Sequence, residues 1–379
     1  MGKWKFASIS EIASVNMGQS PDSSFINDLG QGMPFLQGNA EFGKLHPCEQ
    51  YWCINPIKIA DAGDLLVSVR APVGEINLAD KQYCIGRGLS AINFWGVNNE
   101  FARYAFFMNV LQLHIKSQGT TFLAVSKKDI DNIILHYPVE QTEQRKIAEI
   151  LTTVDEVIDN TRILIDKYTN IKKGMMQDLL INGVDTPISQ LCKIISGSTP
   201  STSDESFWNG SHVWITPNDL SNLTIPYIKT SARKLSNDGV KQATGILLPA
   251  NSIIISNRAP VGYCAVVSVP FTFNQGCKGL ICNPDTDPLY LYYCLKQSTP
   301  QLEKVSSGTI FLELPKRELS RFIIRIPKTF NEQRTISNQI FAADTKIKTE
   351  CDYLDKLLDI KKGLMHDLLT NTISVDPLL

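Results

Sequence analysis

The chain has 379 residues, of which 43% are hydrophobic, 8% are aromatic and 20% are charged. At about 150 residues per domain this length predicts two or three domains, and the composition excludes a disordered or collagen-like chain. The 37 basic and 38 acidic side chains give a net charge of −1. This balance excludes a uniformly basic, histone-like protein but leaves room for local basic loops.

The nine cysteines are scattered along the chain and form no paired Cys-x-x-Cys motif. A structural zinc site and a disulfide framework are therefore not expected, and we predict reduced, mostly buried cysteines. The first part of the chain has no apolar signal-peptide core, and no apolar run is long enough to span a membrane. We expect a cytoplasmic protein that makes no membrane contact.

Polar and basic side chains in the loops of both halves are candidates for ligand contacts. Ser, Thr, Asn and Gln in loops are turn formers by default. Arg70 and Arg258, each directly before an Ala-Pro pair, could bind a phosphate or a guanine edge, and a structural salt bridge is an equally good explanation. The other candidates are Gln19, Ser20, Asn39, Lys127 and Lys128 in the first half and Thr199, Asn218, Lys316 and Arg317 in the second.

In each half a buried strand is predicted before the same Arg-Ala-Pro-Val-Gly turn, at residues 65–69 and 253–256. Apolar helices are predicted at residues 101–113 and 288–302. Short strands, turns and a little helix indicate a mixed α and β domain in each half.

The chain contains an internal repeat. The segment Ser-Gln-Gly-Thr-Thr-Phe-Leu at residue 117 recurs as Ser-Ser-Gly-Thr-Ile-Phe-Leu at residue 306, an offset of 306 − 117 = 189. This offset holds without a gap from residue 117 to residue 182, whereas Arg70 and Arg258 are offset by 188. Insertions concentrate in loops, and a repeat this long exceeds the ~20–50 residues of a solenoid unit. The sequence therefore predicts a duplicated pair of domains.

The end of each repeat is predicted to be a long helix. From Thr142 to about Ile181 apolar residues recur at spacings of four and three, which is typical of a coiled-coil seam. Thr142 and Asn331 are the predicted N-caps. The predicted seam consists of Ile147, Leu151, Val154, Ile158 and Ile165 in the first helix and Ile336, Ile340, Ile347, Leu354 and Leu357 in the second.

A single amphipathic helix usually packs on its own domain, but two helices in the same register favour pairing with each other. About 40 residues at ~1.5 Å each would give an antiparallel rod of roughly 60 Å. Lys172-Lys173-Gly174 and Lys361-Lys362-Gly363 interrupt the two seams. They are interpreted either as a solvated basic patch near a helix end or as a contact to a partner or a phosphate backbone.

The predicted fold class is therefore α+β, with two mixed α/β domains separated by a long antiparallel helical coiled coil and related by an internal pseudo-two-fold repeat. The predicted boundaries are residues 1–141 for the first domain, 142–182 for the central helix, 183–330 for the second domain and 331–373 for the distal helix.

Catalytic motifs are missing from the sequence. There is no Gly-x4-Gly-Lys-Ser/Thr loop for ATP and no Asn-Pro-Pro-aromatic tetrapeptide of the kind amino-methyltransferases use. The five histidines have no equivalents in the other copy, and no carboxylate cluster repeats between the halves. The scaffold is repeated while the loops vary, which favours a binding protein over an enzyme.

Two variable domains, each followed by a long helix with Glu-Gln-Arg near its start and Lys-Lys-Gly near its end, resemble the specificity subunit of a type I restriction–modification system. Glu143, Lys172, Glu332 and Lys361 begin these motifs. The resemblance implies that each domain is a target-recognition domain that reads one half of an asymmetric bipartite target in double-stranded DNA. It also implies that the paired helices set the spacer and dock two modification (methyltransferase) subunits.

The resemblance further implies that restriction (translocase/nuclease) subunits join this core. S-adenosylmethionine, ATP and magnesium would belong to those partners, so that this chain binds no cofactor and is not itself an enzyme. The assembled complex would be a DNA adenine methyltransferase and an ATP-dependent endonuclease. The alternatives are a free-standing nuclease or methyltransferase and an architectural coiled-coil protein with carbohydrate- or protein-binding heads.

Overall fold

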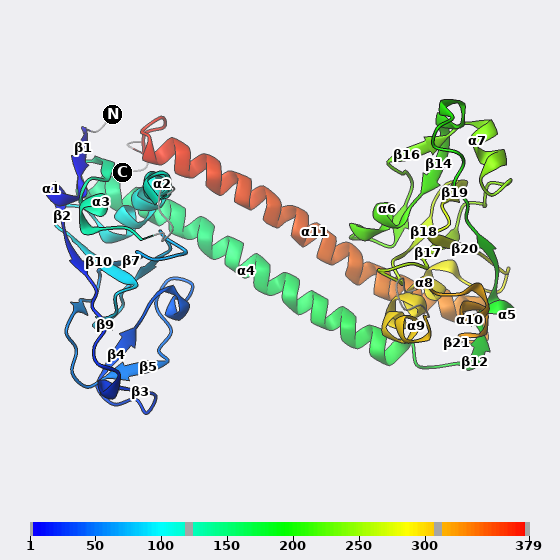
Figure 1. Ribbon diagram of the computed structural model, residues 1–379, viewed down its shortest axis with the longest axis horizontal. Coiled ribbons are helices and arrows are strands. Elements are labelled where there is room, and N and C mark those ends of the chain that lie inside the picture. The colour runs from blue at the N-terminus through cyan, green and yellow to red at the C-terminus, as the bar shows by residue number, and fades with distance from the viewer. Residues whose placement is uncertain (1–2, 118–123, 307–312, 376–379) are drawn as a thin grey trace. The chain divides into compact units, whose positions relative to one another are not determined.

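The computed structural model describes residues 3–117, 124–306 and 313–375 (Figure 1). The repeated Gly-Thr segments at 118–123 and 307–312, singled out in the sequence, lie outside the described residues. The chain divides into two compact units, of which unit 1 comprises Met1–Asn160 and Asp355–Leu379 and unit 2 comprises Thr161–Leu354. Each unit therefore contains one domain and one end of each long helix.

Unit 1 is built from short strands and a few helices. Its strands are β1 (Trp4–Ser8), β2 (Ala13–Met17), β3 (Ile26–Asn27), β4 (Met33–Leu36), β5 (Tyr51–Cys53), β6 (Ile59–Ala60), β7 (Leu65–Ser68), β8 (Ile76–Leu78), β9 (Tyr83–Ile85), β10 (Leu89–Phe94) and β11 (Ile134–Pro138). Its helices are α1 (Ile9–Ile12), η1 (Ser23–Phe25), η2 (Asn39–Glu41), α2 (Asn99–Ser117) and α3 (Lys127–Asp131).

The sheets of unit 1 have the orders β1-β11, β2-β10-β7-β8 and β3-β5-β4-β9-β6. Within the described part of unit 1, the strand pairs are antiparallel except β4 with β9. The apolar run of β7 is buried along its whole length and pairs with β10 on one side and β8 on the other, as a central strand should. Phe101 and Phe106 of α2 are fully buried in the same core as Leu65 and Ile92.

Unit 2 repeats this plan. Its strands are β12 (Val184–Pro187), β13 (Cys192–Ser196), β14 (Trp208–Ile215), β15 (Tyr227–Ile228), β16 (Arg233–Leu235), β17 (Ser252–Ser256), β18 (Cys264–Val267), β19 (Phe271–Phe273), β20 (Cys277–Cys282) and β21 (Ile323–Ile326). Its helices are α5 (Ile188–Leu191), η3 (Glu205–Phe207), α6 (Pro217–Ser221), α7 (Asn237–Gln242), α8 (Pro288–Gln297), α9 (Thr299–Val305) and α10 (Lys316–Arg321).

The sheet orders in unit 2 are β12-β21, β13-β20-β17-β18-β15 and β16-β14-β19. The series β13-β20-β17-β18 corresponds to β2-β10-β7-β8 of unit 1, and the parallel pair of β14 with β19 corresponds to β4 with β9. The duplication read from the sequence is therefore a duplication of topology.

One helix predicted as continuous is broken in the structure. Residues 288–302 form two helices, α8 and α9, which meet at Ser298. Pro300 has no backbone N–H, and in a continuous helix its ring would clash with the carbonyl of Lys296, so α8 ends at Gln297 and α9 starts again with Pro300 in its first turn.

The two long helices are α4 (Gln141–Leu179) and α11 (Phe330–Leu369), of 39 and 40 residues. The predicted N-caps are wrong, because α4 starts at Gln141 and α11 at Phe330. The hydroxyl of Thr329 accepts a hydrogen bond from the backbone N–H of Glu332 at 3.3 Å, as an N-cap side chain does.

The helices pack against each other in antiparallel fashion within each unit (Figure 1). In unit 1 Ile147 and Leu151, from the start of α4, share a core with Met365 and Leu368 from the end of α11. In unit 2 Ile336 and Ile340 from the start of α11 share a core with Leu180, directly after the end of α4. The predicted fold class, mixed α and β domains with long paired helices and an internal repeat, is confirmed.

The predicted seam residues lie on the inward faces of the helices. Ile147, Leu151, Ile158, Ile336, Ile340 and Leu357 are buried, and Val154, Ile165, Ile347 and Leu354 are half-buried. The period of the apolar side chains is therefore also the period of burial.

Candidate nucleic-acid interface

Three chain segments of unit 1 meet around the turn 86–88, which connects β9 to β10. The backbone N–H groups of Gly86 and Gly88 donate to the carbonyls of Leu36 and Gln37 at 2.7 and 3.2 Å. The N–H of Gly18 donates to the carbonyl of Leu89 at 2.9 Å. A Cβ at Gly18 would lie 2.2 Å from the carbonyl oxygen of Gly86, so only glycine permits this approach.

Unit 2 builds the same junction around the turn 274–276, between β19 and β20. The N–H of Asn274 donates to the carbonyl of Ile215 at 3.0 Å, and the N–H of Ser198 donates to the carbonyl of Phe273 at 3.1 Å. A Cβ at Gly197 would lie 2.0 Å from the carbonyl oxygen of Asn274. The Gly-x-Ser/Thr-Pro segments at residues 18–21 and 197–200 therefore serve the same purpose in both units: they bring a loop into backbone contact with this turn.

The predicted polar residues lie on these segments. Ser20 accepts a hydrogen bond from the N–H of Arg87 at 3.3 Å, and Asn39 donates to the Glu75 carboxylate at 2.9 Å. Thr199 donates to the side-chain oxygen of Gln275. Gln19 and Asn218 are exposed. Ser20 and Asn39 use their side chains to hold neighbouring loops, which is the structural role expected of polar loop residues.

Arg70 follows β7 at the edge of the same junction. Its backbone pairs with Ala124, and the N–H of Val69 donates to the carbonyl of Gly88 at 2.9 Å. The pairing carries the chain into α3, so that the exposed Lys127 and Lys128 begin a helix next to the junction. The peptide bonds Ala71-Pro72 and Ala259-Pro260, which follow the two arginines, are both cis.

Arg258 forms a salt bridge, which is one of the two roles predicted for it from the sequence. Its Nε lies 3.6 Å from Oε2 of Glu313, and both side chains are about half exposed, at 50% and 42%. Exposed ion pairs of this kind contribute only about 0–1 kcal/mol to the free energy of unfolding. The guanidinium of Arg258 therefore stays available to another ligand. Lys316 and Arg317 are exposed at the start of α10.

A basic residue that no sequence motif indicates lies beside Arg258. Lys278, on β20, is buried with 8% exposure. Burial lowers the pKa of its ammonium group, the carboxylate of Glu313 opposes this, and Arg258 and Lys316 lower it further. Three cations and one carboxylate thus lie close together in unit 2, which makes this region attractive to an anion such as a DNA phosphate.

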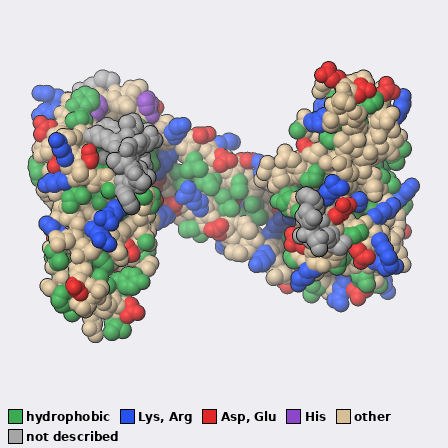
Figure 2. All heavy atoms as spheres, viewed as in Figure 1, with side chains coloured by type: hydrophobic (Ala, Val, Ile, Leu, Met, Phe, Trp, Pro, Cys, Tyr) green, Lys and Arg blue, Asp and Glu red, His purple; other side chains and the backbone are tan. Residues whose placement is uncertain are grey.

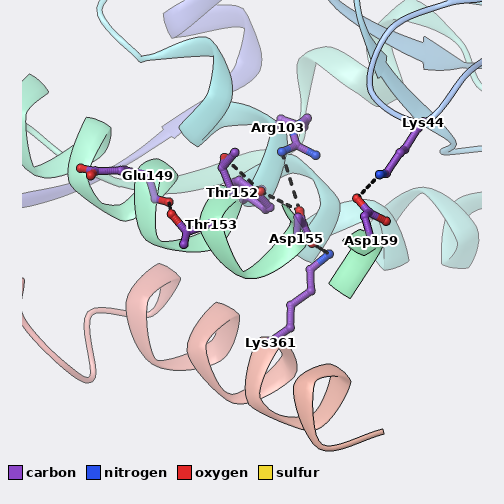
Figure 3. Close-up of polar contacts among 9 residues, drawn as sticks. Lys44, Arg103, Glu149, Thr152, Thr153, Asp155, Asp159 and Lys361 are labelled. Carbon is purple, nitrogen blue, oxygen red and sulfur yellow. Dashed lines mark hydrogen bonds and ion pairs between the residues drawn. The ribbon is translucent and has the colours of Figure 1, made fainter. Parts of the chain in front are cut away.

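Side-chain contacts that were not predicted from the sequence fix each domain on the long helices. In unit 1 Asp155 of α4 accepts a hydrogen bond from Tyr104 at 2.7 Å and pairs with Lys361 of α11 at 2.5 Å (Figure 3). Arg103 lies 3.9 Å from the same carboxylate. Burial raises the pKa of Tyr104 to about 12, so its hydroxyl stays protonated and donates.

Unit 2 contains the same contacts, with its tyrosine and aspartate 189 residues later in the sequence and its lysine 189 residues earlier. Tyr293 donates to Asp344 of α11 at 2.7 Å, and Lys172 of α4 pairs with that carboxylate. Lys172 and Lys361 come from the two Lys-Lys-Gly motifs, so the interpretation as a wholly solvated patch is wrong for these two lysines. We name the two triads, Tyr104–Asp155–Lys361 and Tyr293–Asp344–Lys172, the helix clamps.

The glutamines of the two Glu-Gln-Arg motifs are buried and anchor the domains a second time. Gln144 donates to the carbonyl of Pro138 at 2.7 Å and accepts from the N–H of Asn98 at 2.6 Å. Gln333 donates to Pro327 at 3.0 Å and accepts from Asp287 at 2.8 Å. Each glutamine joins the start of a long helix to the strand before it and to a helix start in its domain.

No group of side chains suited to binding a metal occurs among the residues that the structure describes. Within the same ranges no helix has both the length and the apolar character needed to cross a membrane. All nine cysteines are free thiols, and most are buried. On the face shown in Figure 2 each unit carries interspersed basic and acidic side chains, in keeping with the near-neutral net charge.

Comparison with known proteins identifies the family. The family model described as type I restriction modification DNA specificity domain matches residues 1–167 and again residues 184–358. The putative type I restriction enzyme MjaX specificity subunit of Methanocaldococcus jannaschii is 40% identical over 171 residues, which is 45% of this chain and 40% of that protein. The chain thus spans less than half the length of this relative.

Two solved structures share the fold over almost the whole chain. The S subunit of a type I restriction–modification system from M. genitalium has a TM-score of 0.65 at 17% identity and covers 97% of this chain and 96% of its own. A chain solved in work on complex assembly and conformational transition of the type I R-M system has a TM-score of 0.60 at 15% identity, with 97% of both chains covered. The resemblance stated from the sequence is confirmed: the chain belongs to the type I restriction–modification DNA specificity family, whose specificity domain it contains twice.

Proposed function

We propose that this chain is the DNA-reading subunit of a type I restriction–modification complex. Each unit reads one half of an asymmetric, bipartite target in double-stranded DNA. The paired helices set the spacer between the half-sites and dock two modification subunits, which restriction subunits then join. The double match to the specificity domain is the observation that carries this proposal.

The loops of the two units support recognition of two different half-sites. The junctions around the turns 86–88 and 274–276 have the same backbone frame but different exposed side chains, with Arg87 where unit 2 has Gln275. Different side chains on one frame would read different base edges in a major groove. An asymmetric target follows from that difference.

The long helices support the spacer function. A helix of 39 residues is about 58 Å long, and half-sites read on one face of the duplex lie about 34 Å, or a whole number of helical turns, apart. Clamps of the same chemistry in both units would fix how each domain is mounted on the helices. The helix faces turned away from the seam remain for the modification subunits.

In this proposal the chain itself catalyses nothing. S-adenosylmethionine, ATP and magnesium are bound by the partner subunits, and the chain supplies specificity by contacts alone. The related structure solved in the context of complex assembly supports partners of this kind. The near-neutral net charge predicts weak DNA binding by the isolated chain and tighter, salt-sensitive binding by the assembled complex.

Methylome sequencing of cells with and without this gene, in the presence of the modification subunit, tests the proposal. We expect adenine methylation at one asymmetric, two-part sequence that disappears when the gene is deleted. Methylation that persists without the gene would contradict the proposal, as would methyl transfer or nuclease activity by the purified chain alone. Specific DNA binding with nanomolar affinity by the chain alone would contradict the prediction that tight binding requires the assembled complex.

A further inference from the structure

The turn 86–88 of unit 1 presents a single long side chain on a rigid backbone. Its flanking residues are glycines, and a Cβ at Gly88 would lie 2.5 Å from the carbonyl oxygen of Gln37. The N–H of Arg87 donates to Ser20 at 3.3 Å, while its own side chain is exposed. The side chain of Arg87 therefore projects from a turn whose backbone is fixed by three neighbouring segments.

The turn 274–276 of unit 2 presents Gln275 in the equivalent place. The offset is 275 − 87 = 188, the same as between Arg70 and Arg258. The side chain of Asn274 is used within the turn, because its Oδ1 accepts from the N–H of Gly276 at 3.1 Å. Gln275 is thus the one exposed side chain of this turn.

Thr199 orients the amide of Gln275. The threonine hydroxyl donates to Oε1, which fixes the carbonyl side of the amide toward Thr199 and leaves Nε2 with its two hydrogens free to donate. An amide oxygen has two lone pairs, so Oε1 can accept a second hydrogen bond. The amide can therefore offer one donor and one acceptor to a base edge.

From this we infer that Arg87 and Gln275 are equivalent base-reading residues of the two units, with Arg87 selecting guanine and Gln275 selecting adenine. Two parallel guanidinium N–H groups match the O6 and N7 acceptors of guanine in the major groove, whereas the donor and acceptor of a glutamine amide match N7 and N6 of adenine. The inference rests on the proposed function, since it names which bases the two junctions contact.

The surroundings of each turn fit this role. Arg70 in unit 1 lies on the strand end that hydrogen bonds to Gly88, and Arg258 in unit 2 follows Asn257, whose N–H donates to the carbonyl of Gly276 at 2.9 Å. Each reading residue therefore has a basic residue beside it that can hold the phosphate backbone while the turn enters the groove.

Reciprocal exchange of the two side chains tests the inference. The chain is co-expressed with its modification subunit in a host without adenine methylation, and the methylated sequences are determined for the wild type, Arg87→Gln and Gln275→Arg. We expect Arg87→Gln to lose a guanine at one position of one half-site, by roughly tenfold or more in preference, and to gain adenine there. Gln275→Arg makes the opposite change at one position of the other half-site.

Matched substitutions outside the junctions provide the controls. Lys5→Gln removes one exposed positive charge from unit 1, and Gln242→Arg adds one to the exposed end of α7 in unit 2. Neither control should change the base preference at any position. Arg87→Ala is a further variant that should lose the guanine preference without gaining adenine.

The possible outcomes separate this inference from the proposed function. If Arg87→Gln lowers methylation equally at all sequences, the arginine contacts phosphate only and the inference is overturned. An unchanged wild-type target in both exchange variants overturns it as well, although the proposed function then stands. If the wild type itself methylates no bipartite sequence, the proposed function fails.

Discussion

Asp155 and Asp344 are 189 residues apart in the sequence and make the same two contacts in their own units. Each accepts a hydrogen bond of 2.7 Å from a tyrosine of its domain, and each forms an ion pair with a lysine of the opposite long helix. One carboxylate thus joins three elements: a domain helix, the long helix that follows the domain, and the other long helix.

The two clamps differ in burial, and this predicts unequal effects of removing their lysines. Asp344 has 6% of its side chain exposed and Asp155 has 22%. Lys172→Met leaves a nearly buried carboxylate without its cation and should lower the free energy of unfolding by about 2–4 kcal/mol. Lys361→Met should lower the free energy of unfolding by about 1 kcal/mol, because water and Arg103 remain near Asp155.

Urea unfolding of the full chain measures both effects. Lys348→Met is the matched control, since Lys348 pairs with Asp352 on the exposed surface of α11. That variant should stay within about 0.5 kcal/mol of the wild type. A Lys172→Met effect no larger than the control would show that the clamp in unit 2 contributes nothing to stability.

The buried glutamines predict a second stability effect. Gln144→Ala leaves the carbonyl of Pro138 and the N–H of Asn98 without their partner, and Gln333→Ala does the same at Pro327 and Asp287. Each variant should lose about 2 kcal/mol, which is the cost of unsatisfied buried polar groups. Gln301→Ala, on the exposed surface of α9, should change little in the same unfolding measurement.

A paired insertion in the long helices tests the spacer function. The clamps place residue 155 opposite residue 361 and residue 172 opposite residue 344. Four residues inserted after Tyr168 together with four inserted after Ile347 therefore lengthen both helices between the clamps and leave both clamps intact. The added ~6 Å of helix should lengthen the methylated spacer by roughly one to two base pairs.

The control insertion places four residues after Gly245, whose Cβ position faces open space. This loop insertion should leave the spacer unchanged. A spacer that stays the same in the paired helix insertion would refute the idea that the helices measure it.

His136 predicts a pH dependence of the stability of unit 1. Its ring stacks on Phe6 at 4.2 Å and lies 4.6 Å from Trp4. Burial lowers the pKa of His136, although a backbone hydrogen bond to Leu369 opposes this. Below the ordinary value of about 6.5 the unfolded chain therefore binds the proton more readily than the folded chain.

The free energy of unfolding should consequently fall as the pH falls from about 6.5 to the lowered pKa, and level off below it. Trp fluorescence during urea unfolding at several pH values measures this slope. His136→Gln should remove this contribution to the slope. Equal slopes in the variant and the wild type would mean that His136 does not contribute.

Much of the fold could be predicted from the sequence, because its main features are periodic or duplicated. The spacing of Ile147, Leu151 and Ile158 predicted the buried face of α4, and the apolar run at residues 65–69 predicted β7. The continuous helix at 288–302 was wrong because apolar periodicity does not register the backbone effect of Pro300. The side-chain assignments of the candidate interface remain predictions.

The clamps could have been found from the same repeat. Tyr104, Asp155 and Lys361 reappear as Tyr293, Asp344 and Lys172 under one offset of 189 in either direction, yet a tyrosine and an aspartate 51 residues apart give no local signal. Arg87 and Gln275 could not be found from the repeat, because they occupy equivalent positions but are different residue types. Residues that hold the scaffold are repeated, and residues that would distinguish two targets are not.

Unit 1 is formed by the two ends of the chain, residues 1–160 and 355–379, and this has a consequence for synthesis on the ribosome. Met365 and Leu368, which complete the core around Ile147 and Leu151, are translated more than 200 residues after them (365 − 151 = 214). The first domain emerges early but keeps an apolar face uncovered until the last helix has left the exit tunnel. A prematurely terminated chain would therefore expose that face, which favours its capture by chaperones and its degradation by proteases.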